Sequence, residues 1–137
     1  MHVDVDDYKT LEELPVFEKG CDSSYSWSKK FKHLQRSGTA DEIANRLLDI
    51  IPFDDFANKD ALARQDIHLC FTGGEPLMKH AQLCTMEVMT HWMNDGDYPK
   101  NVTYETNGTQ MPRPEFIKFW QEYDGELMIS CSPKLFN

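Results

Sequence analysis

The feature that most constrains the fold is a repeated order of short apolar run, polar turn and helical segment in the second half of the chain. The apolar runs end near residues 72, 106 and 131, and turns rich in Gly, Thr, Asn or Ser follow them. Helical patterns over 77–93 and 114–120 separate the runs. Alternation of this kind predicts a parallel sheet built from βαβ units. Because parallel strands end at one edge of their sheet, the three turns are expected to lie together.

A capping box marks the start of an earlier helix. Thr39 is followed three residues later by Glu42, so the hydroxyl and the carboxylate can each satisfy a free backbone N–H. A mostly helical apolar stripe runs from Ile43 to Ile51, and Pro52 ends it.

Composition limits the possible classes of protein. The 137 residues, 40% of them hydrophobic, provide enough apolar material for one core. Residues 1–15 are acidic without periodicity and are expected to form an irregular N-terminal arm, while 16–137 are expected to form an incomplete α/β domain.

The mean hydropathy of −0.58 argues against a membrane protein, and the net charge of −9 argues against nucleic acid as a partner. Without a signal-peptide pattern, a cytoplasmic, reducing setting is expected, and the four cysteines are interpreted as thiols or metal ligands.

The strongest functional signal is the turn Thr72-Gly73-Gly74-Glu75-Pro76. Two glycines after a strand allow backbone conformations closed to other residues and let a ligand approach the main chain. A glutamate at the start of a helix could hold an ammonium group. A plain turn with a capping glutamate is the alternative interpretation, and the complete five-residue pattern favours a binding site.

The sequence FTGGEPLM around this turn resembles the motif with which radical S-adenosylmethionine (SAM) enzymes hold the amino group of SAM's methionine part. The segments ETNGT and SCSPK, at the next two strand ends, are similar to those of 7-carboxy-7-deazaguanine synthase, in the same order and at fitting intervals. Together the likeness covers about residues 16–137. It implies a partial (β/α) barrel of the radical SAM type, with parallel strands and helices on the outer face.

The resemblance also implies an activity, that of a radical SAM lyase. A 4Fe–4S cluster would cleave SAM reductively, and the resulting 5′-deoxyadenosyl radical would abstract hydrogen from 6-carboxy-5,6,7,8-tetrahydropterin. That substrate would contract to 7-carboxy-7-deazaguanine, which leads to queuosine and related deazapurines. The implied cofactors are SAM, the cluster and Mg, and the implied partners are the pterin substrate and an electron donor such as flavodoxin. A homodimer is left open, and neither nucleic acid nor a membrane is an expected partner.

The resemblance assigns binding roles to residues of the three turns, and no residue is assigned as catalytic. The residues expected to bind SAM lie at the first and third turns: Gly73, Gly74, Glu75, Ser132, Pro133 and Lys134. The residues expected to contact the substrate lie at the first and second turns: Thr72, Glu105 and Thr106. Replacing Glu75 with alanine is expected to weaken SAM binding without unfolding the protein.

The cluster-binding loop departs from the family pattern. Members carry Cys-x-x-x-Cys-x-x-Cys, three thiolates for three irons, with the fourth iron left for SAM. Here Cys21 fits the first position, but Tyr25 and Ser28 occupy the other two. A soft thiolate suits iron–sulfur ligation better than a hard hydroxyl does. The Mg position would be Lys30, which is not a metal ligand.

The remaining cysteines do not replace the missing ligands. Cys70 and Cys84 are expected to be buried small hydrophobes, and Cys131 alone could reach the strand-end cavity.

Two alternative functions stay open: a non-catalytic relative without a cluster that binds SAM or a pterin, and an α/β scaffold that acts through protein contacts. A scaffold has no need of three unusual strand-end turns, whereas a binding protein could keep them without the cysteines.

Overall fold

The computed structural model of the chain describes residues 9–10, 13, 29–34, 36–50 and 67–133. The chain divides into two compact units, Met1–Ser37 and Gly38–Asn137. In the first unit, the 3-10 helix η3 spans Lys29–Leu34. Most of the arm expected at 1–15 lies outside the described residues.

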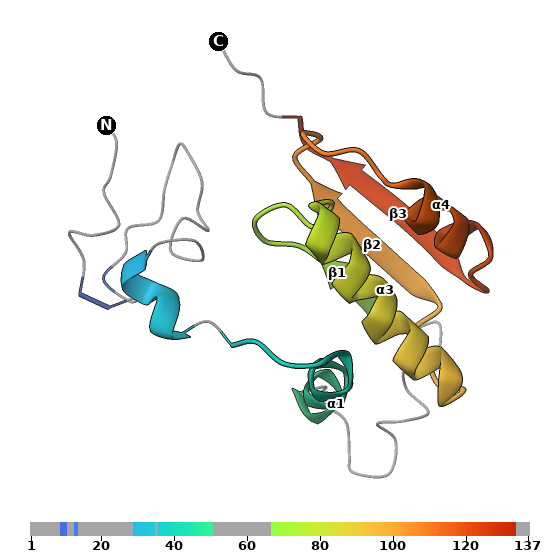
Figure 1. Ribbon diagram of the computed structural model, residues 1–137, viewed down its shortest axis with the longest axis horizontal. Coiled ribbons are helices and arrows are strands. Elements are labelled where there is room, and N and C mark those ends of the chain that lie inside the picture. Colours follow the sequence, from blue (N-terminus) through green and yellow to red (C-terminus); the bar gives the residue numbers. More distant parts are fainter. Residues whose placement is uncertain (1–8, 11–12, 14–28, 35, 51–66, 134–137) are drawn as a thin grey trace. The chain divides into compact units, whose positions relative to one another are not determined.

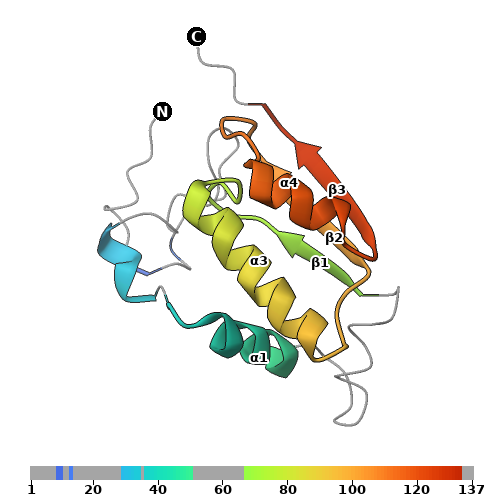
Figure 2. The ribbon, with the colours of Figure 1, turned by 45° about the vertical axis from the view of Figure 1, so that its right-hand side comes forward.

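The second unit is an α/β structure with a three-stranded parallel sheet, in the order β1-β2-β3, and three helices among its described residues (Figures 1 and 2). The strands are β1 (His68–Phe71), β2 (Asn101–Thr106) and β3 (Glu126–Cys131). The helices are α1 (Ala40–Ile50), α3 (Lys79–Asn94) and α4 (Pro114–Gln121). The predicted alternation of parallel strands and helices is therefore confirmed, and no barrel is formed by the described strands.

The capping box at the start of α1 is confirmed. The Thr39 N–H donates to Glu42 Oε2 at 2.8 Å, and the Glu42 N–H donates to Thr39 Oγ1 at 3.3 Å. Helix α1 packs against α3, where His91 Nδ1 lies 3.4 Å from Asp41 Oδ1. None of the described helices is both long and apolar enough to cross a membrane.

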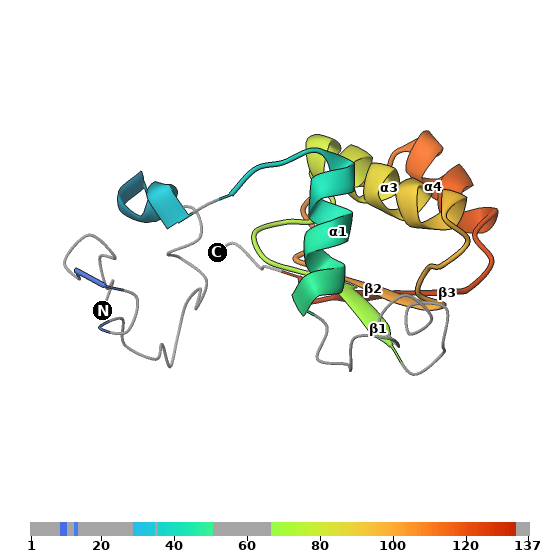
Figure 3. The same cartoon turned by 90° about the horizontal axis from the view of Figure 1, so that it is seen from below.

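The register of the sheet determines which side chains share a face. Phe71 of β1 pairs with Tyr104 of β2, and Tyr104 pairs with Ile129 of β3. Successive side chains of a strand point to opposite faces, so Cys70 and Thr103 belong to the other face. Figure 3 shows α3 and α4 together on one side of the sheet. The sheet therefore has one face covered by these helices and one face that no described helix covers.

The core lies on the covered face and is centred on Tyr104, whose side chain is fully buried. Its ring centroid lies 4.9 Å from that of Phe71, 5.2 Å from that of Phe116 and 5.7 Å from that of Trp120. The Tyr104 hydroxyl donates to Thr85 Oγ1 at 2.8 Å. Among the described residues, the buried hydrophobic ones are Ala44, Leu77, Val88, Met89, Trp92, Val102, Tyr104, Phe116, Trp120 and Tyr123.

The uncovered face of the sheet is mainly polar. His68, Cys70 and Glu105 are exposed on it, and the buried Thr103 is hydrogen-bonded to His68 Nε2. The expectation that Cys70 is a buried hydrophobe is wrong. Strand alternation places this thiol on the face that carries no described helix, and an apolar run in the sequence does not reveal which face will be covered.

Candidate functional site

The three strand ends meet at one edge of the sheet, as the sequence predicts. The Thr72 hydroxyl, just after β1, donates to Glu105 Oε2 of β2 at 3.1 Å. Thr106 at the end of β2 pairs with Cys131 at the end of β3. The Ser132 N–H then donates to the Thr106 carbonyl at 2.8 Å. Direct hydrogen bonds thus connect the first turn to the second and the second to the third.

Glu75 is the centre of this network. Its Oε1 accepts hydrogen bonds from the Leu77 N–H at 2.9 Å and from Thr106 Oγ1 at 2.7 Å, and its Oε2 accepts one from the Asn107 N–H at 2.9 Å. A carboxylate offers about four acceptor positions, so one remains, on Oε2. The side chain therefore holds the β1–α3 turn against the end of β2 and keeps one position for a further donor.

The two glycines of the first turn leave open space beside the backbone. Gly73 has a φ of 83° and Gly74 a φ of 57°, a region that L side chains rarely adopt. A Cβ built at either residue would meet no atom within 4 Å. The conformation requires glycine here, and the space beside it is large enough to admit a ligand atom.

Gly108 allows the second turn to pack closely against the third. Its φ is 74°, and a Cβ added to it would lie 2.9 Å from the sulfur of Cys131. Its N–H donates to Thr106 Oγ1 at 3.1 Å. The absence of a side chain at Gly108 is thus what allows the Cys131 sulfur to pack at the strand-end edge.

Replacing Gly108 with alanine is expected to lower the free energy of unfolding by about 2 kcal/mol, because a strained φ costs on the order of 1–3 kcal/mol and the new Cβ collides with Cys131. Gly96→Ala is the matched control, since Gly96 has a φ of 76° and nothing within 4 Å of its Cβ position. Urea denaturation of both variants separates the contact from the strain. Equal losses would contradict the proposed fit between Gly108 and the Cys131 sulfur.

Gln82 is a site-supporting residue that sequence reasoning missed. It is 1% exposed, and its Nε2 donates to the carbonyls of Leu77 and Met111 while its Oε1 accepts from the Arg113 N–H at 2.9 Å. It joins the start of α3 to the loop between β2 and α4. The sequence does contain a sign of this role: Gln82 is a polar residue on an otherwise apolar helix stripe, four residues before Met86.

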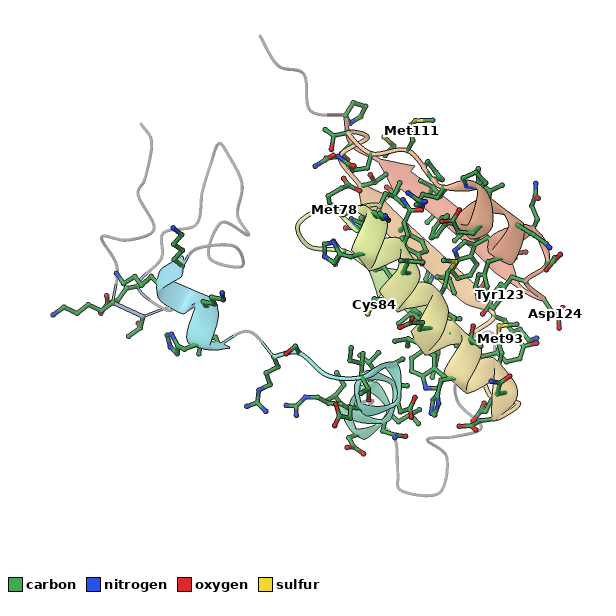
Figure 4. All side chains as sticks on the ribbon, viewed as in Figure 1. Met78, Cys84, Met93, Met111, Tyr123 and Asp124 are labelled. Atoms are coloured by element: carbon green, nitrogen blue, oxygen red, sulfur yellow. The ribbon has the colours of Figure 1, made fainter. Side chains whose placement is uncertain are left out.

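Exposed methionines lie at the same end of the sheet as the three turns. Met78 is 45% exposed and Met111 is 82% exposed. Figure 4 shows both near the strand ends, whereas Tyr123 and Asp124 lie at the opposite end of the sheet. The edge therefore combines a polar centre with apolar side chains beside it.

The described residues hold no group of three or more His, Cys, Asp or Glu side chains that could bind a metal ion. Cys70, Cys84 and Cys131 are free thiols. Partial burial, and then the negative charge of Glu105, raise the pKa of the Cys70 thiol, which favours its protonated form. The predicted cluster loop with Cys21 lies outside the described residues.

An open hollow of about 420 Å³ lies between α1 and α3, away from the strand ends. Its lining residues are Ala40, Asp41, Leu83, Met86, Glu87, Thr90, His91 and Asn94. None of the residues that the sequence singles out for binding is among them, so the candidate site remains the strand-end edge.

The expected binding residues gather at this edge with one exception: Lys134 lies outside the described residues. Hydrogen bonds connect the three turns at this edge, and the residues that make them are Thr72, Glu75, Glu105, Thr106 and Ser132. No protein-family model, curated protein or solved structure matches the chain.

Proposed function

We propose that the chain is a SAM-binding domain of the radical SAM type, related to 7-carboxy-7-deazaguanine synthase and acting on 6-carboxy-5,6,7,8-tetrahydropterin. The observation that supports this most is that Glu75, from the first motif, is bonded to Thr106 and Asn107, from the second. The third motif reaches the same place through the Ser132 N–H. Three motifs separated along the chain thus contribute to one edge, as a shared ligand would require.

The one-sided coverage of the sheet supports a barrel as the complete architecture. In a (β/α) barrel the helices lie outside and the inner face of the strands looks into the barrel, with functional groups at the carboxyl ends of the strands. Here α3 and α4 share one side of the sheet (Figure 3), and His68 and Glu105 are exposed on the other. In this proposal the polar face would line the interior.

The residues at the edge fit the methionine part of SAM, which carries an ammonium and a carboxylate. The ammonium would take the remaining acceptor position of Glu75, and the open space beside Gly73 and Gly74 would admit the ligand against the backbone. The exposed residues Thr72 and Ser132 lie at the same edge. When bound, SAM would supply the adenosyl group used in the family's chemistry. The chain's own residues would bind and orient it.

The residues do not fit a 4Fe–4S cluster. One cysteine, Cys21, occupies the loop expected to provide three, and hydroxyl side chains stand at Tyr25 and Ser28. This mismatch favours a second candidate function, that of a relative without a cluster which binds SAM or the pterin and does not turn it over.

The binding proposal predicts that Gly74→Ala weakens SAM binding at least tenfold, because the new methyl group fills the space left for the ligand. Gly96→Ala is the matched control: its φ is also positive, and its Cβ position is equally free of neighbours. Isothermal titration of SAM into the wild type and both variants makes the comparison. No binding by the wild type, or equal affinities for the two variants, would count against a SAM site at this edge.

The cluster is tested separately. After anaerobic reconstitution, the wild type is expected to hold little iron and sulfide per chain, whereas Tyr25→Cys combined with Ser28→Cys is expected to hold more. The double variant Tyr25→Ala with Ser28→Ala controls for altering the loop. Stable, near-stoichiometric iron and sulfide in the wild type would overturn the mismatch and strengthen the enzyme proposal.

A further inference from the structure

The second turn of the strand-end edge contains the pair Asn107-Gly108, which is able to undergo an intramolecular reaction. The backbone nitrogen that follows an asparagine can attack the side-chain carbon Cγ and close a five-membered ring. A glycine in the next position favours this attack, because it has no Cβ to obstruct the approach. Glycine is also required at this position, since the φ of Gly108 is 74° and a Cβ would lie 2.9 Å from the Cys131 sulfur. The packing of the turn therefore demands the second residue of a susceptible pair.

The Asn107 side chain presents a polarised carbonyl group. Its Oδ1 accepts hydrogen bonds from the Thr109 N–H at 2.9 Å and from the Thr109 hydroxyl at 2.6 Å. When a nucleophile adds to Cγ, negative charge develops on Oδ1, and donors already directed at that oxygen stabilise the charge. Thr109 thus provides the two donors of an oxyanion hole.

The attacking nitrogen has a route for its proton. The Gly108 N–H donates to Thr106 Oγ1 at 3.1 Å, and the Thr106 hydroxyl donates to Glu75 Oε1 at 2.7 Å. An amide N–H becomes acidic while its nitrogen forms a new bond, so a base within hydrogen-bond reach lowers the barrier. The proton can pass to the Thr106 oxygen while the hydroxyl proton passes to the Glu75 carboxylate. The first turn thereby supplies the base for a reaction in the second turn.

We propose that the strand-end edge promotes its own modification at Asn107. The bond from Gly108 N to Asn107 Cγ forms, and the bond from Cγ to the side-chain nitrogen breaks. That nitrogen leaves as ammonia, with the proton that Glu75 received returned to it through solvent. Gly108 and Thr109 are exposed, so water reaches the resulting succinimide and opens it at either carbonyl, giving aspartate or isoaspartate. Neither step needs an oxidant or a reductant, and the proposal does not depend on which ligand the edge binds.

Either product alters the contacts that hold the turns together. The Asn107 N–H donates to Glu75 Oε2 at 2.9 Å, so aspartate at this position adds a negative charge to a residue already bonded to a carboxylate. Isoaspartate lengthens the backbone between this N–H and Gly108, whose close approach to the Cys131 sulfur leaves no spare room. The modification is therefore expected to separate the second turn from the other two as the protein ages.

Prolonged incubation of the whole chain near neutral pH, followed by proteolysis and mass spectrometry, tests the proposal. The folded wild type is expected to convert Asn107 about tenfold faster than the same chain in urea, where only the local sequence acts. Asn101, which Val102 follows in β2, is the internal reference and is expected to remain unconverted. A folded protein that converts Asn107 no faster than the chain in urea would overturn the proposal.

Variants of Thr109 test the oxyanion hole. Thr109→Val removes the hydroxyl donor and keeps the N–H, so it is expected to slow conversion several-fold in the folded protein and to leave the rate in urea unchanged. Thr109→Ser restores a hydroxyl and is expected to restore the rate. Thr90→Val is the matched control, because Thr90 is also exposed and its hydroxyl donates to the Met86 carbonyl, on α3. Equal rates for Thr109→Val and Thr90→Val would contradict the role of Thr109.

The pH dependence of the rate separates catalysis by Glu75 from simple ordering of the turn, without any substitution. In the unfolded chain hydroxide must remove the Gly108 proton, so the rate rises steeply with pH. With Glu75 as an internal base, the rate in the folded protein is expected to rise less steeply across the neutral range. Parallel slopes for the folded and unfolded chains would overturn the assignment of Glu75 as the base.

Discussion

Tyr104→Ala is expected to lower the free energy of unfolding by about 3–5 kcal/mol, the range for removing a large aromatic side chain from a core. The side chain is fully buried and contacts the rings of Phe71, Phe116 and Trp120, so its removal leaves a cavity at the centre of the covered face. Tyr104→Phe keeps the ring and loses the bond to Thr85, and is expected to cost about 1 kcal/mol. Urea denaturation followed by circular dichroism measures both.

The pH dependence of stability gives a second readout of Tyr104. Burial raises the pKa of its hydroxyl well above the usual value, because the charged form is disfavoured in the core. The folded protein therefore binds this proton more strongly than the unfolded chain does. The stability that this protonated hydroxyl contributes to the folded state is fully present below the unfolded pKa of about 10. It is lost progressively as the pH rises above that value toward the folded pKa. The slope of stability above that pH is expected to be shallower in Tyr104→Phe.

Two results would contradict this view of the core. A decrease in the free energy of unfolding of less than about 1 kcal/mol for Tyr104→Ala would mean that the ring is not closely packed. An unchanged alkaline slope in Tyr104→Phe would assign the pH dependence to another group. Tyr123 is the first to examine, because burial also raises the pKa of its hydroxyl.

Glu75→Ala is expected to lower the free energy of unfolding by about 2–4 kcal/mol, even without any ligand. The substitution removes three hydrogen bonds to a charged acceptor, from Leu77, Thr106 and Asn107. Hydrogen bonds to charged groups contribute about 1.5–3 kcal/mol each. Glu75 is partly exposed, so water can hydrogen-bond to the groups that the substitution frees, and the loss of stability is smaller than the sum of the three bonds. Glu75→Gln is expected to fall between the wild type and alanine, because its amide nitrogen cannot accept a hydrogen bond.

Glu105→Ala is the matched control for Glu75→Ala. Glu105 is an exposed carboxylate at the same edge, and it accepts a hydrogen bond from the Thr72 hydroxyl at 3.1 Å. Its removal is expected to change stability by about 0.5 kcal/mol or less. Thermal and urea unfolding of both variants gives the comparison. Equal stability changes would show that the Glu75 network does not hold the strand ends together.

This structural role changes how Glu75 can be used to test function. The sequence alone suggests that Glu75→Ala weakens SAM binding without unfolding the protein. With three intramolecular bonds on the carboxylate, weaker binding in this variant could follow from displaced turns. The glycine pair Gly74 and Gly96 avoids the difficulty, because neither substitution removes a hydrogen-bonding side chain.

Features that depend on neighbouring residues could be predicted from the sequence. The Thr39 and Glu42 capping box is an interaction over three residues, and it forms as predicted. The strand ends near 72, 106 and 131 follow from apolar runs closed by polar turns, and the parallel sheet follows from their alternation with helices. The need for glycine at residues 73 and 74 is likewise local, because φ is a property of the backbone itself.

Features that depend on residues far apart in the sequence were decided by the tertiary structure. The bonds of Glu75 to Thr106 and Asn107 span about thirty residues, and so does that of Gln82 to Met111; no local pattern encodes such partners. Cys70 is exposed because helices cover one face of the sheet and not the other, which strand periodicity cannot specify. Local propensities thus place each turn at the end of its strand. Only the packing of strand against strand determines which donor each turn presents to the next.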